Sequence, residues 1–149
     1  MRRGGFTLLE LSIVLIIIGL ILAVVIRGAV LRKSAKIDAT VSSFQINYNS
    51  CEAYFNLYRS YPGDLDGDGK IESDGITELE SKGFTVKKTN PYGGGFSILW
   101  QNYLSDSGNY IITTNIPPDV DSLIDQKIDD GDISTGRYRR FGGNSVLRI

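Results

Sequence analysis

The chain has 149 residues and a formal net charge of −1, with no histidine and a single cysteine. This length allows one modest domain and an extension. The lack of histidine removes the commonest general base and transition-metal ligand, and one cysteine cannot form an intrachain disulfide. These absences count against an enzyme. The enzymatic alternative is carboxylate chemistry, with Asp64 or Asp129 as a general acid.

The charges are distributed unevenly along the chain. Residues 1–60 contain seven lysines and arginines and three acidic residues, whereas residues 61–149 contain nine basic and fourteen acidic residues. A basic, apolar first part therefore precedes an acidic second part. The aspartate-rich second part predicts no nucleic-acid partner and favours bound cations.

A long apolar segment follows the first residues. It has sixteen residues without a formal charge from Leu11 to Ile26, or twenty-one counted from Phe6 with Glu10 as the interruption. A membrane-spanning helix needs about 20 such residues. Two arginines precede the segment and four basic residues follow it, so charge alone does not orient it in a membrane.

The residues at the start of this segment form a specific pattern. A short basic leader ends at Gly5, Phe6 would be the first residue after a cut there, and Glu10 would be the fifth, in the sequence GG-FTLLEL. This pattern closely resembles the type IV prepilin signal. A secretory signal peptide cut after the apolar segment, near Ser34 and Ala35, is the competing interpretation.

The resemblance implies a fate for the N-terminus and a fold. The superfamily includes type IV pilins and the pseudopilins of type II secretion, in which a membrane aspartyl prepilin peptidase removes the leader, here residues 1–5, and Phe6 becomes N-methylated. The implied fold is α+β, with a long N-terminal α-helix, transmembrane in its first half, packed on a small antiparallel β-sheet head.

The resemblance also implies partners and a location. The partners are copies of the chain itself, other pilin-like subunits, the prepilin peptidase, an inner-membrane assembly platform and membrane lipid. The location is the bacterial inner membrane, crossed once, with the head in the periplasm, and a filament after assembly.

Glu10 is the polar exception in the apolar segment. A carboxylate inside a membrane span costs several kcal/mol unless it is paired, roughly 2.5–3.5 kcal/mol on insertion scales. In a filament it would pair with the Phe6 amine of a neighbouring subunit, which makes Glu10 the predicted assembly residue. The alternatives are that Glu10 reaches the membrane interface or is protonated.

The helical pattern continues beyond the apolar segment, with no proline before Pro62. From Ile37 onward apolar and aromatic residues alternate spacings of four and three, which places them on one helix face. We therefore expect one helix from Phe6 to about Tyr58. The predicted stripe comprises Val30, Ile37, Val41, Phe44, Tyr48, Cys51, Phe55 and Tyr58.

Cys51 lies inside this stripe. We interpret it as a small core thiol, with a reactive or lipidated cysteine as the alternative. A polar row flanks the stripe and comprises Lys36, Ser43, Asn47 and Ser50. The chain then divides into a leader (1–5), a transmembrane and assembly helix (6–27), an amphipathic helix of the head (28–60) and a globular periplasmic head (61–149).

An acidic loop, DLDGDGKIESDG, begins after Gly63. Its aspartates and its glycine follow the D-x-[DN]-x-[DN]-G pattern of calcium-binding loops, although Gly75 stands where a bidentate glutamate is expected, so Asp74 or Glu78 would have to substitute. A solvated turn is the alternative. The candidate calcium ligands are Asp64, Asp66, Asp68, Lys70 through its carbonyl, Glu72 and Asp74.

The sequence of the rest of the head predicts short helices and strands. Thr77 to Glu80 reads as a capping box that starts a short helix. Strands are expected at 84–88, 96–100 and 110–114, a second helix after Pro117, and a closing hairpin around Gly142, Gly143 and Asn144.

The second helix ends in a further acidic group, Asp125, Asp129, Asp130 and Asp132. Acids at a helix C-terminus oppose the helix dipole and require compensation. The nearby arginines are the first candidates, namely Arg137, Arg139 and Arg140. A bound cation is the second, because the resemblance extends to major pseudopilins that hold calcium in a C-terminal loop.

The sequence therefore predicts a structural filament subunit, with a pseudopilin of type II secretion as the preferred class. The chain lacks the cysteine pair that closes the C-terminal loop of major type IV pilins. A minor type IV pilin for adhesion, motility or DNA uptake, and a membrane-anchored calcium-dependent binding module, are the alternatives.

Overall fold

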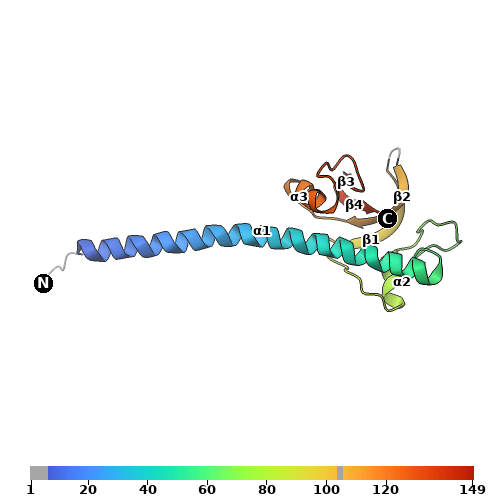
Figure 1. Ribbon diagram of the computed structural model, residues 1–149, viewed down its shortest axis with the longest axis horizontal. Helices are drawn as coiled ribbons and strands as arrows, with labels where there is room; N and C mark the ends of the chain where they lie inside the picture. The colour runs from blue at the N-terminus through green and yellow to red at the C-terminus, as the bar shows by residue number, and fades with distance from the viewer. Residues whose placement is uncertain (1–6, 104–105) are drawn as a thin grey trace. The chain divides into compact units, whose positions relative to one another are not determined.

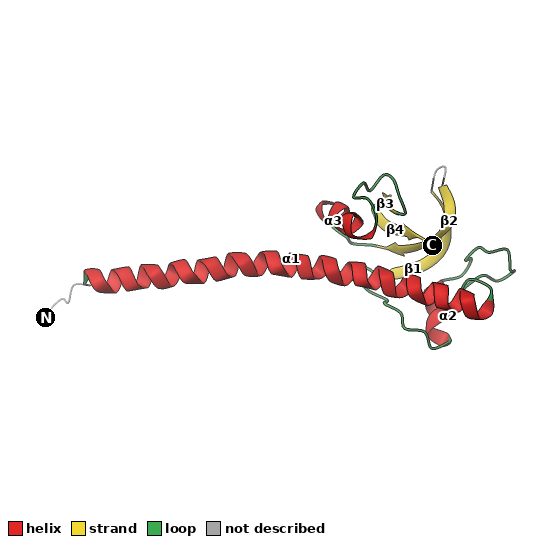
Figure 2. Cartoon of the chain, viewed as in Figure 1, coloured by secondary structure: helices red, strands yellow, loops and turns green. Residues whose placement is uncertain are grey.

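The computed structural model describes residues 7–103 and 106–149, and it has the expected α+β arrangement (Figures 1 and 2). A 51-residue helix, α1, spans Leu8–Tyr58, which confirms the single long N-terminal helix. The chain divides inside α1 into two compact units, Met1–Ala35 and Lys36–Ile149. The second unit adds α2 (Gly75–Ser81), β1 (Phe96–Tyr103), β2 (Asp106–Thr113), α3 (Pro118–Ile128), β3 (Tyr138–Phe141) and β4 (Asn144–Arg148).

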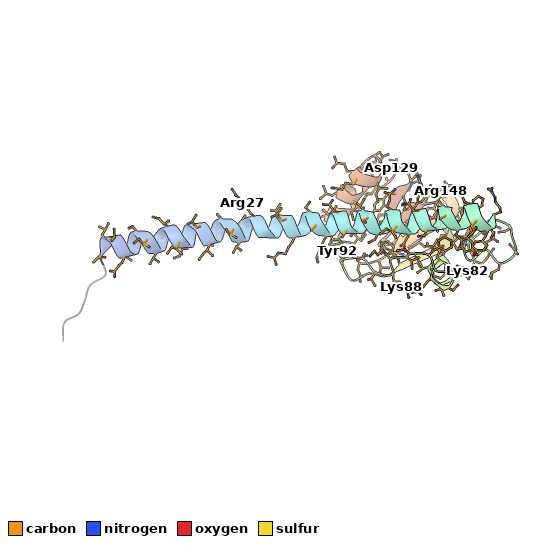
Figure 3. The ribbon with its side chains drawn as sticks, turned by 60° about the horizontal axis from the view of Figure 1, so that its bottom comes forward. Arg27, Lys82, Lys88, Tyr92, Asp129 and Arg148 are labelled. Atoms are coloured by element: carbon orange, nitrogen blue, oxygen red, sulfur yellow. The ribbon has the colours of Figure 1, made fainter. Side chains whose placement is uncertain are left out.

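In the first unit, α1 carries apolar side chains on all sides (Figure 3). An 18-residue window of this helix has a mean hydropathy of 3.1, and none of it is buried. Leu9, Leu15 and Val24 expose 70%, 69% and 71% of their surface. By length and composition this segment is sufficient to cross a membrane.

In the second unit, four antiparallel strands form one sheet in the order β1-β2-β4-β3. β1 and β2 form a hairpin whose register runs from Phe96 opposite Thr113 to Tyr103 opposite Asp106. The strand expected at 96–100 lies within β1, and the strand expected at 110–114 coincides with the end of β2, which stops one residue earlier. The expected closing hairpin is also present, because β3 and β4 flank Gly142 and Gly143.

One face of the sheet packs against α1. The Phe44 ring lies edge to face with Phe96 and Tyr138, with centroids 5.1 and 5.5 Å apart. Burying each such large apolar side chain contributes about 1.5–3 kcal/mol. The same core includes Ile71, Ile76, Leu79, Ile98, Ile111, Ile116, Val120, Ile124 and Leu147.

The opposite face carries a second apolar cluster, formed by Tyr110, Ile112 and Val146. Side chains at the ends of β1 and β3 pack against this cluster. The Tyr103 ring contacts Tyr110 with centroids 5.2 Å apart and stacks on Phe141 at 4.6 Å. The sheet therefore has an apolar cluster on each face, and the one remote from α1 is built from its own strands.

The buried face of α1 in the head is displaced from the predicted stripe. Cys51 is fully buried, as predicted, but Tyr58 is 46% exposed and Tyr54 is buried in its place. Most of the predicted flanking polar row faces inward, since Ser43, Asn47 and Ser50 are buried. The centre of the buried face thus lies between the predicted apolar stripe and its polar neighbour.

The strand predicted at 84–88 is wrong, and the buried polar row explains why. Asn47 donates a hydrogen bond to the Lys87 carbonyl at 3.0 Å and accepts one from the Lys87 N–H at 2.8 Å. Ser50 donates to the Thr85 carbonyl at 2.6 Å. Because side chains of α1 satisfy this backbone, the segment does not need a neighbouring strand.

The capping box predicted at Thr77 is also wrong. α2 begins at Gly75, and its N-cap is Asp74, whose side chain accepts from the Ile76 N–H at 3.2 Å. Glu80, the acid of the predicted box, pairs with Lys88 at 2.7 Å, while Glu78 accepts from the Tyr54 hydroxyl at 2.5 Å and from the Gly63 N–H at 2.6 Å. This carboxylate therefore holds the loop after α1 against α2.

Burial of Cys51 predicts an unreactive thiol. Desolvation, with a smaller contribution from Glu52, raises the pKa of the Cys51 thiol to about 12. At pH 8 the reactive thiolate should then be about a thousandfold rarer than for a thiol at the ordinary value, since each pKa unit is a factor of ten.

We expect alkylation of the native chain by iodoacetamide, followed by mass spectrometry in detergent, to be at least a hundredfold slower than after unfolding in guanidinium. Equal rates in the two conditions would contradict the burial of this side chain.

Candidate functional site

Three segments contain the residues that the sequence singles out. The first is the N-terminal segment around Glu10, the second is the acidic loop between α1 and α2, and the third is the acidic end of α3. Gly5 and Phe6, the predicted cleavage and methylation residues, lie outside the described residues.

Glu10 forms a capping box with Thr7 at the start of α1. Its Oε2 atom accepts from the Thr7 N–H at 2.8 Å and from the Thr7 hydroxyl at 2.9 Å, and the Glu10 N–H donates back to that hydroxyl at 3.2 Å. This contact is not among the sequence-based predictions, although Thr7-Leu8-Leu9-Glu10 fits the S/T-x-x-E pattern of a capping box. Glu10 therefore has a local role at the helix N-terminus within this chain.

The acidic loop brings together four of its six candidate ligands. One carboxylate oxygen from each of Asp64, Asp66, Asp68 and Glu72 lies within 4.8 Å of the others. We call residues 64–72 the Asp64 loop. All four acids are at least partly exposed, and this spacing is compatible with oxygen ligands around one calcium ion.

Backbone N–H groups hold the Asp64 loop in this shape. Asp64 accepts from the Gly67 N–H at 2.7 Å and from the Gly69 N–H at 3.1 Å, and Glu72 accepts from the Leu65 N–H at 3.0 Å. These bonds close the loop on its own side chains, as expected for aspartates in turns.

The other two candidate ligands of this loop are Lys70 and Asp74. The predicted ligand atom of Lys70 is its carbonyl oxygen, which stays a prediction, while its amine pairs with Asp68 and lowers the pKa of the Asp68 carboxyl. Asp74 caps α2 and also accepts from the Ile98 N–H of β1 at 3.0 Å. Asp74 is therefore a structural residue outside the group of four.

The third segment assembles three acids at the end of α3. One carboxylate oxygen from each of Asp125, Asp129 and Asp130 lies within 4.8 Å of the others, and we call these residues the Asp125 cluster. Figure 3 shows Asp129 beside α3. Asp132 is outside this group. Its carboxylate accepts hydrogen bonds from the backbone N–H and from the hydroxyl of Ser134.

Asp125 is the most unusual member of the cluster. It is 0% exposed, and neither of its carboxylate oxygens has a hydrogen-bond partner among the residues the structure describes. Burial, followed by the charges of Asp130 and Asp129, raises the pKa of the Asp125 carboxyl to about 6, and the nearby Gly131 N–H opposes this shift.

The arginines expected to compensate these acids have other partners. The Arg137 guanidinium donates to the Arg148 carbonyl and lies over the Tyr48 ring. The Arg139 guanidinium pairs with Asp106 at 2.8 Å, on the sheet face that is remote from α1. Only the backbone N–H of Arg137 reaches the cluster, where it donates to Asp129.

The third arginine compensates an acid that sequence analysis did not consider. Asp121 of α3 is 0% exposed, and it accepts from Tyr138 at 2.7 Å and from Ser145 at 2.5 Å, and pairs with the Arg140 guanidinium. The signal for this acid was its position next to Val120, on the inner face of an amphipathic helix. This network fixes α3, and with it the Asp125 cluster, against β3 and β4.

Replacement of Asp121 should therefore destabilise the head strongly. Removing one partner of a buried ion pair costs about 3–5 kcal/mol, because the remaining groups stay buried without compensation. We expect Asp121→Ala to lower the free energy of unfolding by this amount, measured by thermal unfolding in detergent with near-ultraviolet circular dichroism. The control is Ser122→Ala, an exposed neighbour on α3, and equal effects of the two substitutions would refute the role of Asp121.

Comparison with known proteins identifies the first segment. Residues 1–26, of 149, match the family described as the prokaryotic N-terminal methylation motif. No curated protein and no solved structure significantly matches the chain. The motif and the long apolar helix that begins within it are consistent with a membrane-anchored, type IV pilin-like protein.

Proposed function

We propose that the chain is a structural subunit of a type IV pilin-like filament, with a pseudopilin of type II secretion as the best-fitting class. One observation carries this proposal: the methylation motif over residues 1–26 lies on the part of α1 before Lys36, where the apolar side chains are exposed. An exposed apolar surface of this size requires lipid or other apolar helices around it.

In this proposal a prepilin peptidase removes residues 1–5 at the inner membrane, and Phe6 is methylated. Before assembly, the subunit has α1 in the bilayer and the head in the periplasm. An assembly platform moves α1 from lipid into a bundle of like helices, where each apolar side chain exchanges one apolar environment for another.

Glu10 supplies the register of this assembly. Its contacts with Thr7 both end on Oε2, so among the described residues Oε1 accepts no hydrogen bond and remains for the Phe6 amine of a neighbouring subunit. The capping box orients the carboxylate, and the intersubunit pair neutralises it in an apolar surrounding. This pairing is stronger than in water because the local dielectric constant is low.

The alternative assignments share this architecture. A minor type IV pilin for adhesion, motility or DNA uptake would use the same helix with a different surface partner. A membrane-anchored calcium-dependent binding module would use the Asp64 loop as its active part, and the methylation motif favours assembly over this reading.

Glu10→Gln tests the proposal in the native host. The variant should lose residues 1–5 and gain the mass of one methyl group on Phe6, as the unchanged chain does, because glutamine preserves the size of the side chain. We expect at least tenfold less of it in the sheared filament or envelope-complex fraction, measured by quantitative immunoblotting, because no charge attracts the neighbouring amine.

The matched control is Glu52→Gln, the same substitution in the head part of α1. It should assemble at the normal level. A chain that retains residues 1–5, or a Glu10→Gln variant that assembles as well as the control, would exclude the proposed mechanism.

The Asp64 loop remains a prediction for calcium, and Trp100 provides a probe for it. The Lys70 amine lies 5.9 Å from the centroid of the Trp100 ring, so this indole is next to the loop. Terbium, a luminescent substitute for calcium, should be excited through this single tryptophan, and Asp66→Asn should reduce its affinity at least tenfold. Unchanged luminescence in Asp66→Asn would argue for a solvated turn.

A further inference from the structure

The apolar part of α1 ends in three basic residues. Arg27 comes directly after the apolar segment, and Arg32 and Lys33 follow less than two helical turns later. All three are exposed and belong to the first unit, and we call them the basic collar. No aspartate or glutamate occurs in the sequence between Glu10 and Asp38, so this stretch of the chain has no acid that offsets their charge.

The basic collar surrounds the helix. An α-helix turns by about 100° per residue, so Arg32 lies about 140° around the axis from Arg27, and Lys33 about 100° beyond Arg32. The remaining angle back to Arg27 is about 120°, so the three charges are spread almost evenly around α1. Figure 3 shows Arg27 extending away from the helix. A single protein partner would contact one side of α1, whereas a lipid leaflet surrounds it, and the even distribution therefore favours lipid.

Exposed apolar side chains separate the charges of the collar. Val30 and Leu31 lie between its members in the sequence and expose 67% and 69% of their surface. This mixture is typical of the boundary between hydrocarbon and lipid headgroups, where long basic side chains keep their charge in the polar layer. Lys36 is not counted in the collar, because it belongs to the second unit and lies 5.2 Å from the centroid of the Tyr92 ring.

The length of the apolar segment places the collar at the depth of the headgroups. The part of α1 that precedes Arg27 is about 28 Å long, close to the hydrocarbon thickness of about 30 Å, so Arg27 lies at its boundary. Side chains of a helix lean toward its N-terminus, which is the direction of the bilayer here. The Arg32 Nε atom accordingly donates to the carbonyl of Gly28, one turn back, at 3.3 Å. Arg32 and Lys33 therefore reach back into a headgroup layer about 5–7 Å thick.

The position of the collar opposes the usual charge bias of membrane proteins. Basic residues normally remain on the cytoplasmic side of a span, whereas the proposed function has the collar on the periplasmic side. In that proposal, removal of residues 1–5 also removes Arg2 and Arg3 from the other side. The mature span then has its flanking basic side chains at the end next to the head. This arrangement calls for a role other than orientation during insertion.

We propose that the basic collar binds the headgroups of anionic phospholipids, in preference to zwitterionic ones, in the leaflet where the apolar segment ends. Each basic side chain near an anionic membrane surface increases affinity about fivefold. The bound headgroups hold the unassembled subunit at one depth, and they are released when α1 leaves the bilayer. The inference rests on the proposed function for the orientation of α1 and for its exit from the bilayer, whereas lipid binding itself requires no assembly.

The test uses the full chain in detergent, with Arg2→Gln and Arg3→Gln so that the result does not depend on removal of the leader. Phosphatidylglycerol or phosphatidylcholine with the same acyl chains is titrated into the micelles, and native mass spectrometry measures the apparent dissociation constant of each lipid. We expect phosphatidylglycerol to bind at least tenfold more tightly. This preference should decrease as the concentration of ammonium acetate is raised, because salt screens exposed charges.

Variants of this chain assign the preference to the collar. Adding Arg32→Gln and Lys33→Gln together should weaken binding of phosphatidylglycerol at least tenfold and leave binding of phosphatidylcholine unchanged. Arg32→Lys preserves the charge and should retain the preference. The matched control is Lys87→Gln with Lys88→Gln, which removes two adjacent exposed lysines of the head and should change neither affinity.

Equal affinity for the two lipids, or a preference that survives the double substitution in the collar, would overturn the inference. If the lipids bind equally and the double variant falls at least tenfold in the sheared filament or envelope-complex fraction, the partner of the collar is a neighbouring subunit instead. The proposed function fails separately, through the Glu10→Gln test, because that substitution leaves the collar and its lipid affinity unchanged.

Discussion

The structure depends above all on an apolar helix surface that its own chain does not cover. Burying a large apolar side chain stabilises a protein by about 1.5–3 kcal/mol, and a side chain left in water does not contribute this free energy. In the first unit such exposed side chains surround α1 on all sides. No face of this segment prefers water, because Glu10 and Ser12 are its polar exceptions from Leu8 to Ile26. The segment therefore belongs in a bilayer or among like helices, and the head must fold without its help.

The head achieves this by burying polar as well as apolar residues of α1. Sequence periodicity predicted the helix, the buried Cys51 and the core position of Phe44, because spacings of three and four depend only on helix geometry. It could not show which side chains would face inward. In the sequence, Asn47 and Ser50 look like residues of a solvent-exposed row. In the structure they form hydrogen bonds with the backbone of residues 85–87, which lie far along the chain. No local sequence pattern indicates such distant partners.

In the C-terminal part too, local features of the structure could be predicted from the sequence, whereas the pairing of acids with arginines could not. Proline and glycine predicted the limits of α3 and of the last hairpin, because these residues act on their own backbone. The pairing of charged side chains depends on which face of the sheet each one occupies. Neighbouring residues of a strand point to opposite faces of the sheet, so Arg139 and Arg140 of β3 reach Asp106 and Asp121 on different sides. Closeness in sequence to the Asp125 cluster was therefore a poor guide to their partners.

Glu10 and Asp125 show how an acid can specify something that the isolated chain lacks. Glu10 is exposed and held by Thr7, so its cost appears only when the surroundings become apolar, and in the proposed filament a counter-charge from another subunit would offset it. Asp125 is buried within the chain, so its cost is present as soon as the head folds. The acid in the head therefore needs compensation within each subunit, whereas the acid in the apolar helix needs it only in apolar surroundings.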